Sequence, residues 1–367
     1  MLHTSFSSRF RLRLRPHLVA VAALLTAPAV ILATPGTADA AETRNRADAG
    51  AGWLGRQLDR DSHLMTTSFG GQSFPDYGLT ADVVLALDSA KVGRKAARQA
   101  TGALRHNVLA YTGGSDSKEH YAGAYAKLVL VATAQNADAS AFGGGPRQNL
   151  VAGLRALECG KGQSCAAGNK GRFSDVSQYG DFSNAFSQSL ALIGLERATN
   201  RGASHAAVSF LVEQQCGNGG FPEMFGASPC VATVDATGFA VQALTTVGGK
   251  AARAAASDAG RWLKRHQHGN GSFTGNGARN ANSTALAAQA PTAVGRDNAA
   301  AEARIFLRDL QVGCAGKAAN RGMVRYARGG EGDSVRATSQ AVPALAQATL
   351  ADISRDGASR GLPKLAC

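Results

Sequence analysis

The chain has 367 residues, of which 44% are hydrophobic, 6% aromatic and 18% charged, and its formal net charge is +13. Its lysines and arginines are spread along the whole sequence rather than gathered in one run, which argues against a nucleic-acid partner. The positive charge is still compatible with an acidic surface polymer as a partner.

Residues 1–40 have the features of a secretory signal peptide. Four arginines lead into the mostly apolar run 17–33, and Ala38-Asp39-Ala40 forms a small-x-small cleavage site. No later segment is apolar enough over eighteen or so residues to span a membrane, and no cysteine near the cleavage site could take a lipid. We therefore expect an extracellular chain without a membrane anchor, and cleavage would reduce its net charge to +10.

Residues 41–350 are predicted to form one domain of repeated helical hairpins. The unit is clearest in 206–244, where an apolar helix, a glycine-rich turn and a second apolar helix follow one another. Equivalent positions recur every 44 to 57 residues, at Leu58, Val108, Glu158, Gln215, Gln267 and Gln311. The second apolar segments are expected at 80–87, 121–132, 184–195, 234–244, 284–290 and 338–345. Since each hairpin needs the next to cover its apolar face, six hairpins predict a single all-α body.

The six cysteines suggest three disulfides, which agrees with export. The closest pairings are Cys159 with Cys165, Cys216 with Cys230, and Cys314 with Cys367. The last pair would tether the C-terminal tail, 351–367, to the sixth unit. None of the cysteines forms a CxxC motif, and metal binding is not expected.

Two turns carry a motif that identifies a fold. Gln215, Gly219 and Phe221 follow the pattern Gln-x3-Gly-x-aromatic, and Gln267, Gly271 and Phe273 repeat it. The pattern resembles the QW repeat of squalene and terpene cyclases, with Phe in place of the usual Trp. The resemblance implies an α6/α6 toroid, the fold shared by terpenoid cyclases and protein prenyltransferases, in which the motif glutamine braces a helix end.

The resemblance also draws attention to Asp235. Squalene-hopene-type cyclases protonate their substrate with the middle aspartate of a DxDD motif, and Asp235 lies at the matching place, but both flanking carboxylates are missing. The preferred interpretation of Asp235 is the N-cap of its helix, and Asn282 can cap equally well at the same place in the next unit. Aromatic residues are also scarce for a cyclase, which needs many rings to stabilise cations. Cyclisation is therefore not expected.

The N-termini of the second helices should meet at one mouth of the toroid. The candidate ligand-binding residues there are Tyr77, Tyr121, Tyr125, Phe182, Phe186, Phe239 and Asn282. These side chains either fill the centre as core or line a pocket. Neither a cofactor nor a metal is expected, because the Asp-x-Cys pair of zinc-dependent prenyltransferases is absent.

We favour a secreted, monomeric, non-catalytic protein that binds an unidentified small molecule or cell-surface ligand. The alternative is a divergent enzyme that uses Asp235 as a general acid on an extracellular lipid or glycan. The two interpretations differ in whether Asp235 faces an enclosed cavity or caps its helix at the surface.

Overall fold

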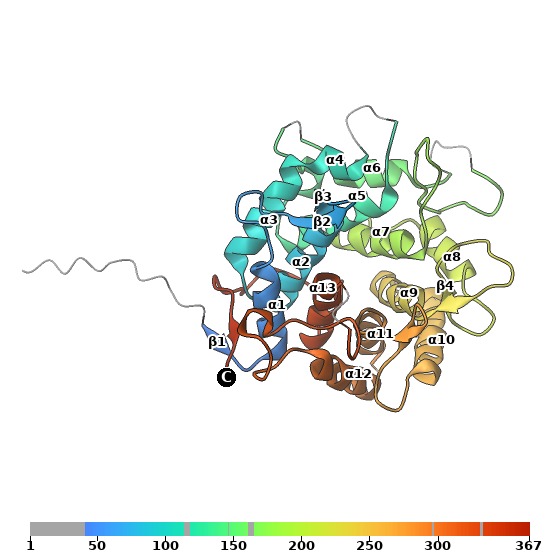
Figure 1. Cartoon of the computed structure of the whole chain (residues 1–367). Coiled ribbons are helices and arrows are strands. Elements are labelled where there is room, and N and C mark those ends of the chain that lie inside the picture. The colour runs from blue at the N-terminus through green and yellow to red at the C-terminus, as the bar shows by residue number, and fades with distance from the viewer. Residues whose placement is uncertain (1–40, 114–117, 146, 161–164, 296, 331–332) are drawn as a thin grey trace, which may run out of the picture. The chain divides into compact units, whose positions relative to one another are not determined.

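The computed structural model describes residues 41–113, 118–145, 147–160, 165–295, 297–330 and 333–367. The expected signal segment lies outside these described residues. The chain from Ala40 to Cys367 makes up one structural unit, and Figure 1 shows the order of its helices.

Six helices form an inner ring. They are α2 (Tyr77–Ser89), α5 (Ala122–Ala134), α7 (Ala185–Ala198), α9 (Val234–Val247), α11 (Ala281–Ala293) and α13 (Ser334–Leu345). Each packs against the next in this order, and α13 packs against α2, so the ring is closed. Apolar or small residues surround most of each helix, as expected for a helix buried on nearly all sides. All six were predicted from the sequence as second apolar segments.

An outer helix precedes each inner one along the chain. The outer helices are α1 (Arg46–Gly55), α3 (Arg94–His106) with the short α4 (Val108–Thr112), α6 (Leu150–Ala156), α8 (His205–Glu213), α10 (Lys250–His266) and α12 (Asp297–Leu310). These helices are amphipathic where they are long. In α10, Ala252, Ala255, Ala259 and Leu263 are buried at spacings of three and four, and the other face is basic. The all-α, disulfide-containing toroid expected from the sequence is confirmed.

Short hairpins lead into three of the inner helices. β2 (Met65–Phe69) pairs antiparallel with β3 (Gln72–Asp76), β4 (Phe221–Pro222) with β5 (Ala232–Thr233), and β6 (Thr274–Gly275) with β7 (Ala278–Arg279). β1 (Glu42–Thr43) runs parallel to β8 (Lys364–Leu365), which joins the two ends of the described body. The described elements also include two 3-10 turns, Ala139–Ala141 and Ala318–Asn320.

The motif glutamines brace successive hairpins. The Gln215 side-chain amide donates to the Gly219 carbonyl at 2.8 Å and to the Ala255 carbonyl of the next outer helix at 2.9 Å. Gln267 and Gln311 make the equivalent pairs of bonds. The motif glycine has a positive φ in each turn, and a Cβ on Gly271 would collide with a backbone carbonyl of α12. The structural role expected for this motif matches these contacts.

A second repeated contact joins four of the turns to the helices that follow them. The N–H of the buried motif residue Phe221 donates to the Thr237 hydroxyl at 2.9 Å, and Thr237 donates in turn to the Thr233 carbonyl. The equivalent threonines are Thr80, Thr284 and Thr338. Each threonine therefore satisfies a buried backbone donor that the short turn leaves unpaired.

The segment after α13 closes one end of the ring. The N–H of Leu350 donates to the Gln242 side chain of α9 at 3.0 Å, and the N–H of Arg355 donates to the Ala134 carbonyl at the end of α5 at 2.8 Å. Arg197, near the end of α7, donates to the carbonyls of Leu350 and Ile353. This segment therefore crosses the C-terminal ends of three inner helices.

Three disulfides hold the loops and the tail. Cys159 is bonded to Cys165, Cys216 to Cys230 and Cys314 to Cys367, which are the pairings expected from the sequence. The described residues contain no free cysteine. In this part of the chain, no helix combines the length and apolarity that crossing a membrane requires.

Candidate functional site

The N-termini of the inner helices meet at the end of the ring opposite the C-terminal segment. Arg336 at the start of α13 lies 3.5 Å from the Asp76 carboxylate that caps α2. The N–H of Ala185 donates to the Glu223 carbonyl at 3.0 Å, and the N–H of Ala281 to the Tyr326 carbonyl at 2.7 Å. We call the loops that enter the six inner helices at this end the mouth face.

A cavity of about 300 Å³ occupies the centre of the ring. All six inner helices contribute to its lining, which consists of Asp82, Leu85, Lys127, Phe186, Leu190, Asp235, Phe239, Leu286, Gln289, Arg336, Ser339, Gln340, Pro343 and Leu350. Leu350 comes from the segment that crosses the C-terminal ends. The sequence left open whether the centre is filled or hollow, and the structure shows a cavity.

The cavity has an apolar part and a polar part. Phe186 and Phe239 place their rings 5.3 Å apart at an interplanar angle of 52°, next to the leucines of α7 and α11 in the lining. The polar lining comes mainly from α2, α5 and α13. The Gln340 side-chain oxygen, on α13, is buried without a hydrogen-bond partner among the described residues.

Asp235 lines this cavity and does not cap its helix. The N-cap of α9 is Thr233, whose hydroxyl accepts from the Ala236 N–H at 3.3 Å. The capping interpretation of Asp235 is therefore wrong, because Thr233 already fills that position. One carboxylate oxygen of Asp235 is buried without a partner among the described residues.

Burial raises the pKa of Asp235 above its ordinary value, and the nearby Ser283 hydroxyl offsets only part of this effect. The side chain is therefore shifted toward the protonated form, in which it can donate a hydrogen bond into the cavity.

An ion pair lies on the cavity wall. The Lys127 ammonium is 2.8 Å from the Asp82 carboxylate, and both side chains are largely buried. Burial lowers the pKa of Lys127, but Asp82 and Tyr111 more than offset this, so that the pKa is raised overall. Lys127 therefore stays charged inside the ring. Arg336 adds a second cation, held by Asp333 at 3.1 Å.

A second hollow of about 260 Å³ adjoins the cavity on the mouth face. Lys127, Phe186 and Leu190 line both spaces, and Tyr121 and Phe182 line the outer one only. We call this outer hollow the vestibule. Because Phe182 is exposed, the vestibule connects the mouth face to the residues that border the central cavity.

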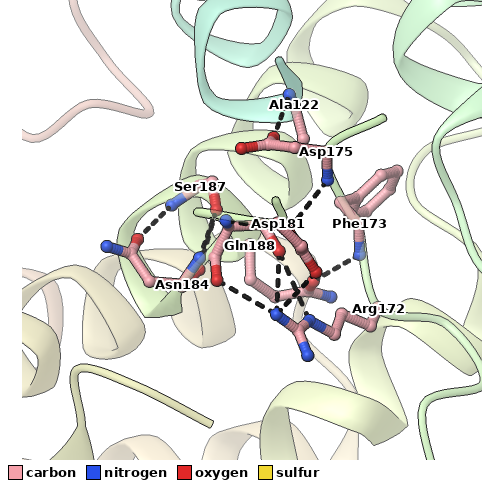
Figure 2. A network of polar contacts seen from close by, with 9 residues as sticks. Ala122, Arg172, Phe173, Asp175, Asp181, Asn184, Ser187 and Gln188 are labelled. Atoms are coloured by element: carbon pink, nitrogen blue, oxygen red, sulfur yellow. Dashed lines mark hydrogen bonds and ion pairs between the residues drawn. The ribbon is translucent and has the colours of Figure 1, made fainter. Parts of the chain in front are cut away.

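Figure 2 shows the polar network that holds the loop beside the vestibule. Arg172 pairs with Asp181 at 2.9 Å, and Asp181 accepts from the Asp175 N–H at 3.0 Å. Asp175 in turn accepts from the Ala122 N–H at the start of α5, at 2.7 Å. Burial raises the pKa of Asp175, and the Ala122 N–H lowers it in part. This network fixes the position of Phe182 one residue after Asp181.

The other candidate residues lie away from the cavity. The Tyr77 ring packs 6.0 Å from Tyr111. Tyr125 is buried, with its hydroxyl 3.3 Å from His120 Nδ1, and it is not part of the lining of either hollow.

Asn282 does not cap α11. The carbonyl oxygen of the Asn280 side chain accepts from the Ser283 N–H at 2.9 Å, and Asn280 is therefore the capping residue. Tyr121 and Phe182 precede α5 and α7 rather than lying within them.

Asp82 and Lys127 were not predicted from the sequence. Each is the sixth residue of its inner helix, as are Leu190, Phe239, Leu286 and Ser339, and all six line the cavity. A charged residue within an otherwise apolar helix was the available signal, because such a residue needs a buried partner or an aqueous cavity.

Comparison with known proteins agrees with this architecture. Residues 185–292 match the family described as prenyltransferase alpha-alpha toroid domain. No curated protein matches the chain.

Three solved structures illustrate the fold. The type II terpene cyclase MstE from Scytonema superposes with a TM-score of 0.59 at 14% identity, over 82% of this chain and 97% of that one. The ent-copalyl diphosphate synthase from Streptomyces platensis gives 0.52 at 17% identity, over 76% and 52%. The unsaturated glucuronyl hydrolase from Bacillus sp. GL1 gives 0.56 at 12% identity, over 82% and 95%.

These identities are low, and the likeness is one of fold, which terpene cyclases share with a glycoside-cleaving enzyme. The closed ring of inner helices, the braced turns and the family match over 185–292 together show that the chain has the α/α-toroid fold.

Proposed function

We propose that this chain is a secreted protein that binds a small, partly polar molecule in the central cavity of its toroid. The observation that carries the proposal is the two-part lining, in which Phe186 and Phe239 line the same space as the polar side chains of Asp235 and Gln340. These two side chains can hydrogen-bond to a ligand hydroxyl or amide. The volume is at the lower end of the range for ligand pockets.

The lining argues against polyene cyclisation, which needs many aromatic rings to stabilise cations. Among the described residues, only Phe186 and Phe239 bring aromatic rings to this space. The two cations of the wall, Lys127 and Arg336, are paired with Asp82 and Asp333. Both can donate further hydrogen bonds to a ligand with a carboxylate or another electron-rich polar end.

One observation supports a second candidate, an enzyme with Asp235 as general acid. The carboxyl group belongs to the lining of the central cavity, and its raised pKa keeps a proton available closer to neutral pH. Such an enzyme would act on an extracellular lipid or glycan. No second carboxylate directly flanks Asp235 in the sequence, and the other carboxylate of the described lining, Asp82, is paired with Lys127.

Occupancy of the cavity tests the binding proposal. Leu286→Trp would fill the space beside the two phenylalanine rings, and Ile305→Trp places the same side chain on the exposed surface of α12 as a control. Native mass spectrometry of the purified chain should detect one small molecule per chain in the wild type and in Ile305→Trp, and none in Leu286→Trp. Equal occupancy in all three forms would place the ligand elsewhere.

A further inference from the structure

The exposed apolar side chains are concentrated on the mouth face. Within the described residues, seven of the eight large apolar side chains that are exposed lie in three mouth-face loops. They are Phe69 and Phe74 before α2, Val176, Tyr179 and Phe182 before α7, and Met224 and Val231 before α9. The eighth, Ile305, lies on the outer helix α12. We call the seven residues the apolar rim.

The hairpin of β2 and β3 shows how little of this rim is covered by the chain itself. Almost every residue of both strands is exposed, and Phe69 at the tip is 82% exposed. The turn consists of Gly70 and Gly71, both at positive φ, and no heavy atom lies within 4 Å of a Cβ built on either. Apolar surface gathered on one face of a protein in this way marks an interaction site.

We propose that the apolar rim docks this protein onto the surface of a lipid bilayer, with Phe69, Tyr179 and Val231 inserted among the headgroups. These three are the most exposed large apolar residues of their loops, at 82%, 71% and 63%. They come from separate loops around one end of the ring, so they can enter a flat interface together.

The composition of the rim fits a bilayer better than a glycan. Phenylalanine and tyrosine favour the headgroup level, and aliphatic side chains such as Val231 and Met224 are suited to acyl chains. Proteins bind sugar polymers through flat aromatic rings with polar groups beside them. The residues Val176, Met224 and Val231 of the rim have neither a ring nor a polar side-chain group. The segments that carry the rim, 65–76, 174–184 and 217–233, contain no lysine or arginine, so apolar contact rather than charge would provide the attraction.

Docking in this orientation would direct the vestibule toward the bilayer. Phe182 belongs both to the rim and to the vestibule lining, so an apolar ligand could move from the membrane toward the central cavity with little exposure to water. The rim itself does not depend on the identity of the ligand or on any catalysis.

Co-sedimentation with vesicles tests the proposal. The vesicles contain equal parts of phosphatidylcholine and phosphatidylglycerol. The variant Phe69→Ser/Tyr179→Ser/Val231→Ser removes one apolar residue from each loop, and Ile305→Ser, at a site 56% exposed on α12, is the matched control. Wild type and Ile305→Ser should bind equally, and the triple variant should bind at least about tenfold more weakly because the inserted apolar area is lost. Thermal melts should show that all three proteins are equally folded.

Several results would overturn the proposal. The wild type could fail to sediment with the vesicles, or the triple variant could bind as the wild type does. An equal loss in Ile305→Ser would show that the effect is not specific to the rim. Complete release of the wild type by high salt would reduce the interaction to surface charge, and binding to insoluble cell-wall polymer but not to vesicles would identify a different partner.

Discussion

Gln188 in the third hairpin makes the same contacts as Gln215 in the fourth, although Gln188 lies on the inner helix α7 and Gln215 lies in the turn after the outer helix α8. The Gln188 amide donates to the carbonyls of Gly171 and Ala207, both at 3.1 Å. Its oxygen also accepts from the Phe173 N–H at 2.9 Å, where other repeats use a threonine (Figure 2). At the repeat position that Gln215 occupies in the fourth unit, the third unit has Glu158, and a carboxylate cannot donate hydrogen bonds to carbonyls. One inner-helix glutamine thus replaces two side chains.

Removal of these braces should destabilise the fold without a specific effect on binding. Gln215→Ala leaves two carbonyls without their donor and should cost about 1 to 2 kcal/mol of unfolding free energy. Gln188→Ala should cost more, because a fully buried N–H also loses its acceptor. Urea unfolding of the two variants, with Gln72→Ala at an exposed glutamine as the control, measures the two losses of unfolding free energy and shows which is larger. Loss of ligand binding at unchanged stability would show that Gln215 belongs to a site.

All six cysteines should be oxidised in the native protein. Thiol titration under denaturing, non-reducing conditions should find no reactive thiol, whereas two or more per chain would contradict the three observed bonds. Loss of the bond between Cys216 and Cys230 in a double serine variant should lower stability by about 3 kcal/mol in the chain-entropy model. Calorimetry of this variant measures the loss.

Stability should fall as the pH rises toward neutrality because of Asp88. Burial raises the pKa of Asp88 to about 7 from an ordinary 3.8, although the Gln135 amide donates to both of its oxygens. The folded state therefore keeps a proton that the unfolded state has already lost. The contribution is fully present below about pH 4, and it is lost as the pH rises through about 7.

The size of this contribution is on the order of 4 kcal/mol, because each tenfold change in proton affinity is worth about 1.4 kcal/mol. Asp88→Asn keeps the shape and removes the titration, so its stability should change much less between pH 5 and 8 than that of the wild type. Urea unfolding at several pH values provides the comparison. Parallel curves for the two proteins would contradict a raised pKa at this site.

The ion pair on the cavity wall should contribute more to ligand binding than to the stability of the fold. Lys127→Met alone leaves the Asp82 carboxylate buried without its partner and should destabilise the protein by about 3 kcal/mol or more. Lys127→Met/Asp82→Leu removes both charges and should recover most of this stability, since apolar replacements of a buried pair are often neutral. If the pair orients a polar ligand, the stable double variant should lose occupancy in native mass spectrometry. Full occupancy would assign the pair a purely structural role.

The inner helices could be predicted well because their apolar runs are long and lie between glycine-rich turns. The glutamine braces could be predicted because Gln215, Gln267 and Gln311 stand at equivalent positions of the repeat. The contacts of Gln188 could not be predicted from this repeat position, because Gln188 lies on the inner helix of its hairpin. Only the folded arrangement brings it to the equivalent carbonyls.

The candidate site was predicted only in part. Phe186, Phe239 and Asp235 do meet in the cavity, but the Tyr125 hydroxyl lies beside His120 and outside the lining. The inner helices are apolar on nearly all sides, so their sequences do not show which face points to the ring centre. The Asp82–Lys127 pair joins two helices and became evident only in three dimensions.

The role of Asp235 is tested most directly by identifying the molecule that each form of the protein carries. Wild type and Asp235→Asn are purified in parallel, and their bound molecules are extracted and compared by chromatography and mass spectrometry. Asparagine keeps the size of the side chain and removes the acid. If the cavity only binds its ligand, both proteins should carry the same molecule, with lower occupancy in the variant where a hydrogen bond to the Asp235 oxygen is weakened. A different molecule in the variant, either an isomer or a larger precursor of the one in the wild type, would show that Asp235 transfers its proton to a substrate and would contradict a purely binding role.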